Sequence, residues 1–217
     1  MDARKYLAEL IGTFILVIVG SMAIVAARAM NAPILVVVPF GFGLGLLAAI
    51  QAVGYVSGGH FNPAVTVAAF LDRRIDAVNA VAYIVAQVVG AIAASGALLL
   101  VADQAAVQAT ASGFPPGRMG QAIIVETLLT AIFLLVILTV TKRAPSHAAF
   151  AIPLTLTAVH FAGIPFSGAS VNPARSLAPA LVGGTIDQNI IVWIIGPVLG
   201  AVIAWAIYRA LEDGSPA

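Results

Sequence analysis

Long apolar segments separated by short polar breaks dominate the pattern of hydrophobic and polar positions along this chain. A helix that crosses the hydrocarbon core of a bilayer needs about 20 mostly apolar residues. Six segments meet this condition and are predicted to be transmembrane helices. They are Tyr6–Ala27, Ile34–Val56, Ala77–Val101, Gln121–Thr141, His147–Pro165 and Asn189–Ala210. The sequence therefore predicts an all-α membrane protein.

The composition supports a chain that lies in lipid. Of its 217 residues 61% are hydrophobic and 9% are charged, whereas about 25% of the residues of a soluble domain are charged. The net charge of +1 and the dispersed Lys and Arg residues exclude a nucleic-acid partner. The absence of Cys excludes a disulfide framework, a thiolate metal site and a Cys nucleophile. We expect neither a metal nor a cofactor, and no enzymatic activity.

The positive charges predict the orientation of the helices. Six spans place both termini on one side, and seven cations fall on that side: Arg4, Lys5, Arg73, Arg74, Lys142, Arg143 and Arg209. The opposite loops carry only Arg28 and Arg118. The positive-inside rule therefore predicts cytoplasmic termini and a multi-pass protein of the plasma (inner) membrane.

Two further apolar segments are too short to cross a membrane. Asn62–Leu71 follows the second span, and Asn172–Val182 follows the fifth. Each begins with the sequence Asn-Pro-Ala, which favours a helix start because Asn caps the helix and Pro suits its first turn. One Asn-Pro is a common turn, but two copies at equivalent places are hard to attribute to chance. We predict two re-entrant half-helices.

The chain repeats itself in other respects. Glu9 precedes Thr13 by four residues in the first span, and Glu126 precedes Thr130 in the same way in the fourth. Three spans and a half-helix thus occur twice, in residues 1–102 and 121–217, joined by a loop at 103–120 within one transmembrane domain of residues 1–217. Because each half has an odd number of spans, the second is inverted, and the half-helices are expected to meet near the midplane.

The meeting point of the half-helices has predictable chemistry. Two helix N-termini, each with partial positive charge and unpaired N–H groups, would disfavour cations and hydronium there. The side-chain oxygens of Asn62 and Asn172 are expected to cap the helices, which leaves their NH₂ groups to donate to water. Irregular backbone before each half-helix is tolerated at this depth where it lines a wet cavity. Its carbonyls, around Gly58, Gly59, His60, Gly168, Ala169 and Ser170, would accept hydrogen bonds from a single file of water.

These motifs resemble those of the aquaporin (major intrinsic protein) family. The segments 57–66 and 170–176 are similar to its two signature loops, which contain Asn62-Pro63-Ala64 and Asn172-Pro173-Ala174. The resemblance covers essentially the whole chain. It implies six transmembrane helices with two half-helices in an inverted 3+3 arrangement, and a homotetramer with one pore in each subunit.

The resemblance also implies a selectivity filter formed by Phe42, His160, Ala169 and Arg175. Arg175 would donate hydrogen bonds to the permeant and repel cations, since intramembrane Arg is rare and generally functional. Glycerol-conducting relatives typically lack the His and carry Asp after the filter Arg, whereas this chain has His160 and Ser176. The expected function is passive conduction of water down osmotic gradients with exclusion of protons and ions. A channel for small neutral solutes such as glycerol or ammonia is the alternative.

Glu9 and Glu126 are the remaining buried charges. The resemblance implies that they support the re-entrant loops by accepting hydrogen bonds, and we interpret them as structural supports. A secondary transporter could share the inverted repeats, but it would need ligands for a coupling ion at the midplane. The chain offers only these two acids there, so a transporter is the weaker alternative.

Overall fold

The computed structural model describes residues 2–212, and these residues form helices, turns and loops without a β-strand. Six long helical segments fit the length and hydropathy of membrane spans. They are α1 (Ala3–Ala29), α2 (Ile34–Ala49) continued by the π-helical η1 (Ile50–Gly54) and α3 (Tyr55–Ser57), α5 (Ala77–Val101), α7 (Met119–Arg143), α8 (Pro145–Ser167), and the 3₁₀ turn η2 (Gln188–Ile191) with α10 (Val192–Leu211). The predicted all-α fold with six spans is confirmed.

The two short segments form the half-helices α4 (Pro63–Leu71) and α9 (Pro173–Val182). The Asn62 side chain accepts a hydrogen bond from the Ala64 N–H, and the Asn172 side chain accepts from the N–H groups of Ala174 and Arg175. Both helices begin with Pro, whose fixed φ angle suits the first turn. The sequence did not predict a further short helix, α6 (Gln104–Ala109), which lies in the loop between the two halves.

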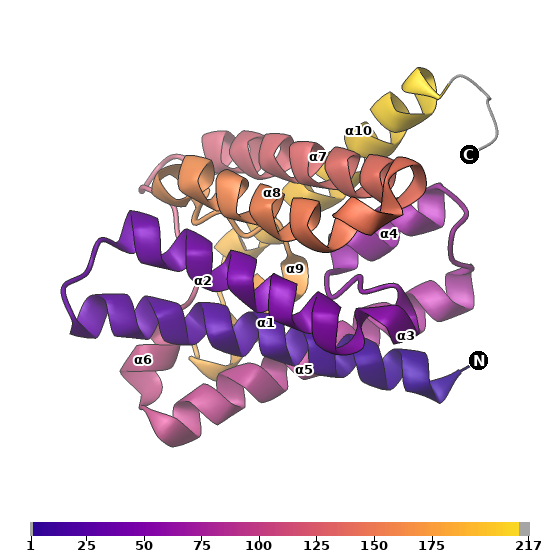
Figure 1. Ribbon diagram of the computed structural model, residues 1–217. Coiled ribbons are helices and arrows are strands. Elements are labelled where there is room, and N and C mark those ends of the chain that lie inside the picture. The colour runs from indigo at the N-terminus through magenta and orange to yellow at the C-terminus, as the bar shows by residue number, and fades with distance from the viewer. Residues whose placement is uncertain (1, 213–217) are drawn as a thin grey trace.

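The inverted halves interlock through the half-helices (Figure 1). In the first half α1 packs against α2 and α5, and in the second half α7 packs against α8 and α10. The half-helix α4 packs against α10, and α9 packs against α5, so each half-helix contacts a long helix of the opposite half. The first residues of α1 and the last residues of α10 lie at the same end of the molecule, which we call the terminal end.

Glycine allows α7 and α10 to approach each other closely. A Cβ atom at Gly196 would lie 2.5 Å from the Cβ of Glu126, and one at Gly200 would lie 2.6 Å from the Cβ of Thr130. Gly41 makes a similar approach to Ala23 of α1. Small residues at such positions let helix backbones approach closely in a membrane.

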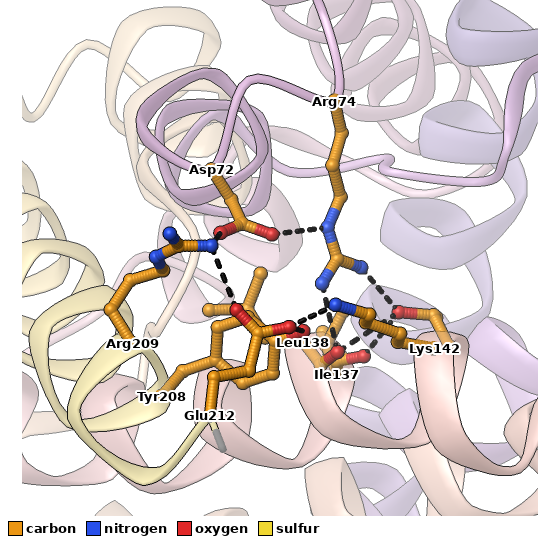
Figure 2. Close-up of polar contacts among 9 residues, drawn as sticks. Asp72, Arg74, Ile137, Leu138, Lys142, Tyr208, Arg209 and Glu212 are labelled. Atoms are coloured by element: carbon orange, nitrogen blue, oxygen red, sulfur yellow. Dashed lines mark hydrogen bonds and ion pairs between the residues drawn. The ribbon is translucent and has the colours of Figure 1, made fainter. Parts of the chain in front are cut away.

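A polar network joins three elements at the terminal end (Figure 2). Arg74, in the loop after α4, donates from Nε to Asp72 (2.7 Å) and from its two Nη atoms to Thr141 (2.6 Å) and the Leu138 carbonyl (2.9 Å) of α7. Glu212 accepts hydrogen bonds from Lys142 of α7 and from Arg209 of α10. The bond from Lys142 is the main cause that lowers the pKa of the Glu212 carboxyl below its ordinary value. The network therefore holds the ends of α4, α7 and α10 together.

The close crossing of α7 and α10 predicts that Gly200→Ala destabilises the protein. The added methyl would press on Thr130 and on the α7 backbone, and overpacking of this kind costs about 1–3 kcal/mol. Gly96→Ala in α5 is the matched control, because its Cβ would meet no atom within 4 Å and Ala is the better helix former. Thermal unfolding in mild detergent should show a lower melting temperature for Gly200→Ala alone. Equal melting temperatures for the two variants would contradict the close crossing.

Candidate functional site

Each loop before a half-helix is held by one buried glutamate. Oε1 of Glu9 accepts from the Ser57 hydroxyl (2.7 Å) and the His60 N–H (3.0 Å). Its Oε2 accepts from the Phe61 N–H (2.7 Å) and from the side chain of Gln87 (2.7 Å). Four donors therefore surround a fully buried carboxylate, as a charge in an apolar environment requires.

Glu126 accepts hydrogen bonds in the same way from the loop before the half-helix α9. Its Oε1 accepts from the Ser167 hydroxyl (2.7 Å) and the Ser170 N–H (2.8 Å), and its Oε2 accepts from the Val171 N–H (2.8 Å). The side chain of Trp193 donates to the Ser167 carbonyl (2.9 Å) and so ties α10 to this loop. The role of Glu9 and Glu126 as structural supports for the loops stays a prediction.

The carboxylates hold a backbone that is locally strained. Phe61 and Val171 have positive φ angles, +50° and +46°, in a region that costs a residue with a Cβ about 1–2 kcal/mol. In each case the strained residue donates its N–H to a glutamate oxygen. A short hydrogen bond to a buried charge offsets strain of this size. The glutamates thus fix the loops in a conformation that the backbone alone disfavours.

The two half-helices meet at their capping asparagines. Asn62 donates from its side-chain nitrogen to the Val171 carbonyl (2.7 Å), and Asn172 donates to the Phe61 carbonyl (3.0 Å). Each asparagine therefore bonds to the loop of the opposite half. An amide NH₂ carries two hydrogens, so one hydrogen of each remains for another acceptor. The prediction that both NH₂ groups are wholly available to water is therefore corrected, since one donation from each goes to a backbone carbonyl across the junction.

A cavity of about 290 Å³ runs past this junction. Both asparagines line it, together with Gly58, Gly59, His60 and Ser170 of the loops. Apolar side chains of α2, α7 and α8, including Leu46, Leu134 and Leu156, form much of the remaining wall. The cavity has the character of an apolar passage with a narrow track of polar groups on one side.

Phe42, His160 and Arg175 come together at one end of the cavity. The rings of Phe42 and His160 are stacked with centroids 4.9 Å apart, and the Arg175 guanidinium lies 4.6 Å from the Phe42 centroid. Their exposed fractions are 2%, 1% and 5%. Cation and aromatic rings therefore close a tight, almost fully buried ring of side chains.

Two polar atoms of this ring are buried and have no hydrogen-bond partner among residues 2–212. They are Nε2 of His160 and Nε of Arg175. Nδ1 of His160 lies 2.9 Å from the Leu156 carbonyl; because a carbonyl only accepts, Nδ1 carries the hydrogen, and Nε2 of the neutral ring is an acceptor. His160 and Arg175, which both line the cavity, thus bring an acceptor and several N–H donors to it, which suits a small molecule that can both donate and accept.

The other predicted site residues are placed less directly. Ala169 is fully buried, and a Cβ at Gly163 of α8 would lie 3.0 Å from its methyl group. Neither Ala169 nor Gly168 is among the residues that line the cavity. The role of Ala169 in the filter stays a prediction, and so does the role of the Gly168 and Ala169 carbonyls as acceptors for water.

Several residues around the site were not predicted from the sequence. Gln87 joins Glu9 to Thr66, Arg74 lines the terminal end of the cavity, and Ser112 contacts Arg175. A polar residue inside an apolar span was the available signal for Gln87. Among residues 2–212 there is no group of three or more His, Asp or Glu that could hold a metal ion.

Comparisons with known proteins agree with this geometry. The family model described as "Major intrinsic protein" matches residues 1–208. The chain is 42% identical to "Glycerol uptake facilitator protein-like 6" of Lactiplantibacillus plantarum, over 93% of this chain and 94% of that protein. It is 41% identical to "Aquaporin Z" of Photorhabdus laumondii, over 96% and 97%, and 41% identical to "Aquaporin Z" of Rhodopseudomonas palustris, over 98% and 95%.

A solved structure shows the same fold. The X-ray structure of the aquaglyceroporin from Plasmodium falciparum superposes with a TM-score of 0.88 at 22% identity, over 96% of each chain. With its six membrane-length helices, the protein is an integral multi-pass membrane protein of a channel class. The chain belongs to the major intrinsic protein family.

The contacts of Glu126 predict that Glu126→Gln lowers stability. An amide has one accepting oxygen, so its NH₂ group would face at least one loop N–H, and a buried donor without a partner costs about 1–3 kcal/mol. Asp103→Asn, which makes the same change at the exposed cap of α6, is the control because Asn caps a helix equally well. The melting temperature in detergent should fall for the first variant only. An unchanged melting temperature would mean that Glu126 does not support the loop.

Proposed function

We propose that the protein is a passive water channel that excludes protons and ions. The observation that carries the proposal is the ring of Phe42, His160 and Arg175, which lines the cavity, is almost fully buried, and combines a cation with N–H donors and a ring-nitrogen acceptor. Water can both donate to and accept from such groups, and it needs little width. A cation would lose its hydration beside a fixed guanidinium charge and two helix N-termini.

Proton exclusion rests on the junction of the half-helices. A water molecule there accepts hydrogen bonds from the remaining amide hydrogens of Asn62 and Asn172, so its own hydrogens point away from the junction along the pore. That orientation interrupts a chain of hydrogen-bonded waters through which protons would otherwise move. The carbonyls of the loops accept from the waters on either side. Water then passes in single file without carrying a proton wire.

Conduction of small neutral solutes is the second candidate. A relative at 42% identity carries a name that refers to glycerol uptake, and leucines make up much of the cavity wall, which suits the carbon backbone of a polyol. His160 opposes this candidate, because its ring fills space in the constriction that glycerol would need.

The seven cations on the side of the termini favour cytoplasmic termini, and the family resemblance favours a homotetramer with four separate pores.

The proposal predicts rapid osmotic water flow. Vesicles that contain the purified protein should shrink faster than protein-free vesicles in a hyperosmotic shock, with a lower activation energy, because water in the pore does not have to dissolve in hydrocarbon. Stopped-flow light scattering over a range of temperatures measures both quantities. Flow no faster than through lipid alone would overturn the proposal.

His160 is predicted to set the discrimination against glycerol. The variant His160→Gly should raise the ratio of glycerol to water permeability roughly tenfold or more, because a barrier lowered by about 1.4 kcal/mol changes a rate tenfold. His147→Gly makes the same change in the exposed first turn of α8 and should leave the ratio unchanged. The two fluxes are measured in the same vesicles. If the unmodified protein already conducts glycerol as well as water, the assignment of the filter is wrong.

A further inference from the structure

Arg175 has a hydrogen-bond partner outside its own helix. Its Nη1 donates to the hydroxyl of Ser112 at 2.5 Å, and the Thr110 carbonyl lies farther away, at 3.4 Å. Ser112 lies in the loop between α6 and α7, 63 residues earlier in the chain. The guanidinium is thus held from one side by a hydroxyl and from the other by the face of Phe42.

The hydroxyl of Ser112 begins a chain of three serines. It lies 2.6 Å from the hydroxyl of Ser176, which lies 2.5 Å from that of Ser170, which in turn donates to the Asn172 carbonyl at 2.9 Å. A hydroxyl has one hydrogen to donate. Ser170 gives its hydrogen to the carbonyl, so Ser176 must donate to Ser170 and Ser112 must donate to Ser176.

The direction of every bond in this chain is therefore fixed. It begins at the Arg175 guanidinium and ends at the backbone of Asn172, the residue that caps the same half-helix. Each hydroxyl both accepts and donates, and Ser170 also accepts a long bond from the Asn172 N–H (3.4 Å). Bonds in such a series strengthen one another. Ser170 and Ser176 are each only 1% exposed, so water competes little for these bonds.

The backbone around Ser112 is held in place independently of Arg175. Gln104 and Gln108 of α6 donate to the Gly183 carbonyl at the end of α9, at 2.8 and 2.9 Å. A Cβ at Gly168 would lie 3.0 Å from the Gly113 nitrogen, so the loop packs directly on the turn that follows α8. The hydroxyl of Ser112 thus comes from a loop that other contacts hold in place, and it can position the flexible side chain of Arg175.

We infer that Ser112, acting through the chain Ser112–Ser176–Ser170, is a positioning residue that holds the Arg175 guanidinium in the constriction and thereby sets its selectivity. The inference rests on the proposed function, since it takes Arg175 to be part of a filter. Without the hydroxyl, Nη1 keeps only the long contact to the Thr110 carbonyl. The guanidinium then samples several positions, and the opening between Arg175, Phe42 and His160 loses its fixed width.

The test compares Ser112→Ala with Ser112→Thr in two measurements. The glycerol-to-water permeability ratio in vesicles should rise roughly three- to tenfold in the Ala variant, as expected for the loss of one ordinary hydrogen bond. It should stay at the original value in the Thr variant, which keeps the hydroxyl. Nitrogen NMR of the Arg175 side chain in the same membranes should resolve two Nη signals in the original protein and in Ser112→Thr. In Ser112→Ala the signals should merge as the guanidinium rotates. Ser95→Ala, which removes a buried hydroxyl without a partner among residues 2–212, is the control and should change neither measurement.

The outcomes separate this inference from the proposed function. An unchanged ratio and unchanged Nη signals in Ser112→Ala would overturn the inference, and so would equal effects of Ala and Thr. An unchanged ratio with a lowered melting temperature would also overturn it, because Ser112 would then serve folding alone. If the original protein conducts no water but the Nη signals merge in Ser112→Ala and are restored in Ser112→Thr, the proposed function fails while the positioning of Arg175 by Ser112 stands.

Discussion

A backbone that leaves its helix inside a membrane must find a partner for every N–H and C=O group, and this constraint governs the whole molecule. The two re-entrant loops satisfy it mainly through Glu9 and Glu126, which accept from the donors that the loops expose. The carboxylates are tolerated at this depth for the same reason, since each is surrounded by donors. The loops, the half-helices that follow them and the cavity between them all depend on these contacts. The asparagine contacts across the junction then join the two halves.

Much of the fold could be predicted from the sequence because the physical signals were long or repeated. An apolar segment of membrane length has few alternatives to a helix, and the repeated Asn-Pro-Ala placed α4 and α9 to within a residue. The residues of the constriction differed in how far the sequence alone identified them. His160 and Arg175 stood out as polar groups in apolar surroundings, whereas Phe42 is one aromatic residue among many, and only the family resemblance distinguished it.

The remaining features depend on contacts between distant segments, which spacing does not encode. The second partner of each asparagine is a carbonyl in the opposite half, more than 100 residues away. Ser112 lies in a loop of small residues that resembles many others, and its significance follows from where α6 places it. Arg74 was interpreted only as a positive charge at the membrane surface. In the structure it lines the end of the cavity and joins α4 to α7.

The central claim is that the junction at Asn62 and Asn172 passes water and interrupts proton transfer. The most direct test measures both fluxes in one preparation of vesicles, with an osmotic shock for water and the decay of an imposed pH gradient for protons. Water flow should exceed that of protein-free vesicles many times over while the pH gradient decays at the rate of lipid alone. A pH gradient that collapses faster in proportion to the amount of protein would contradict the claim.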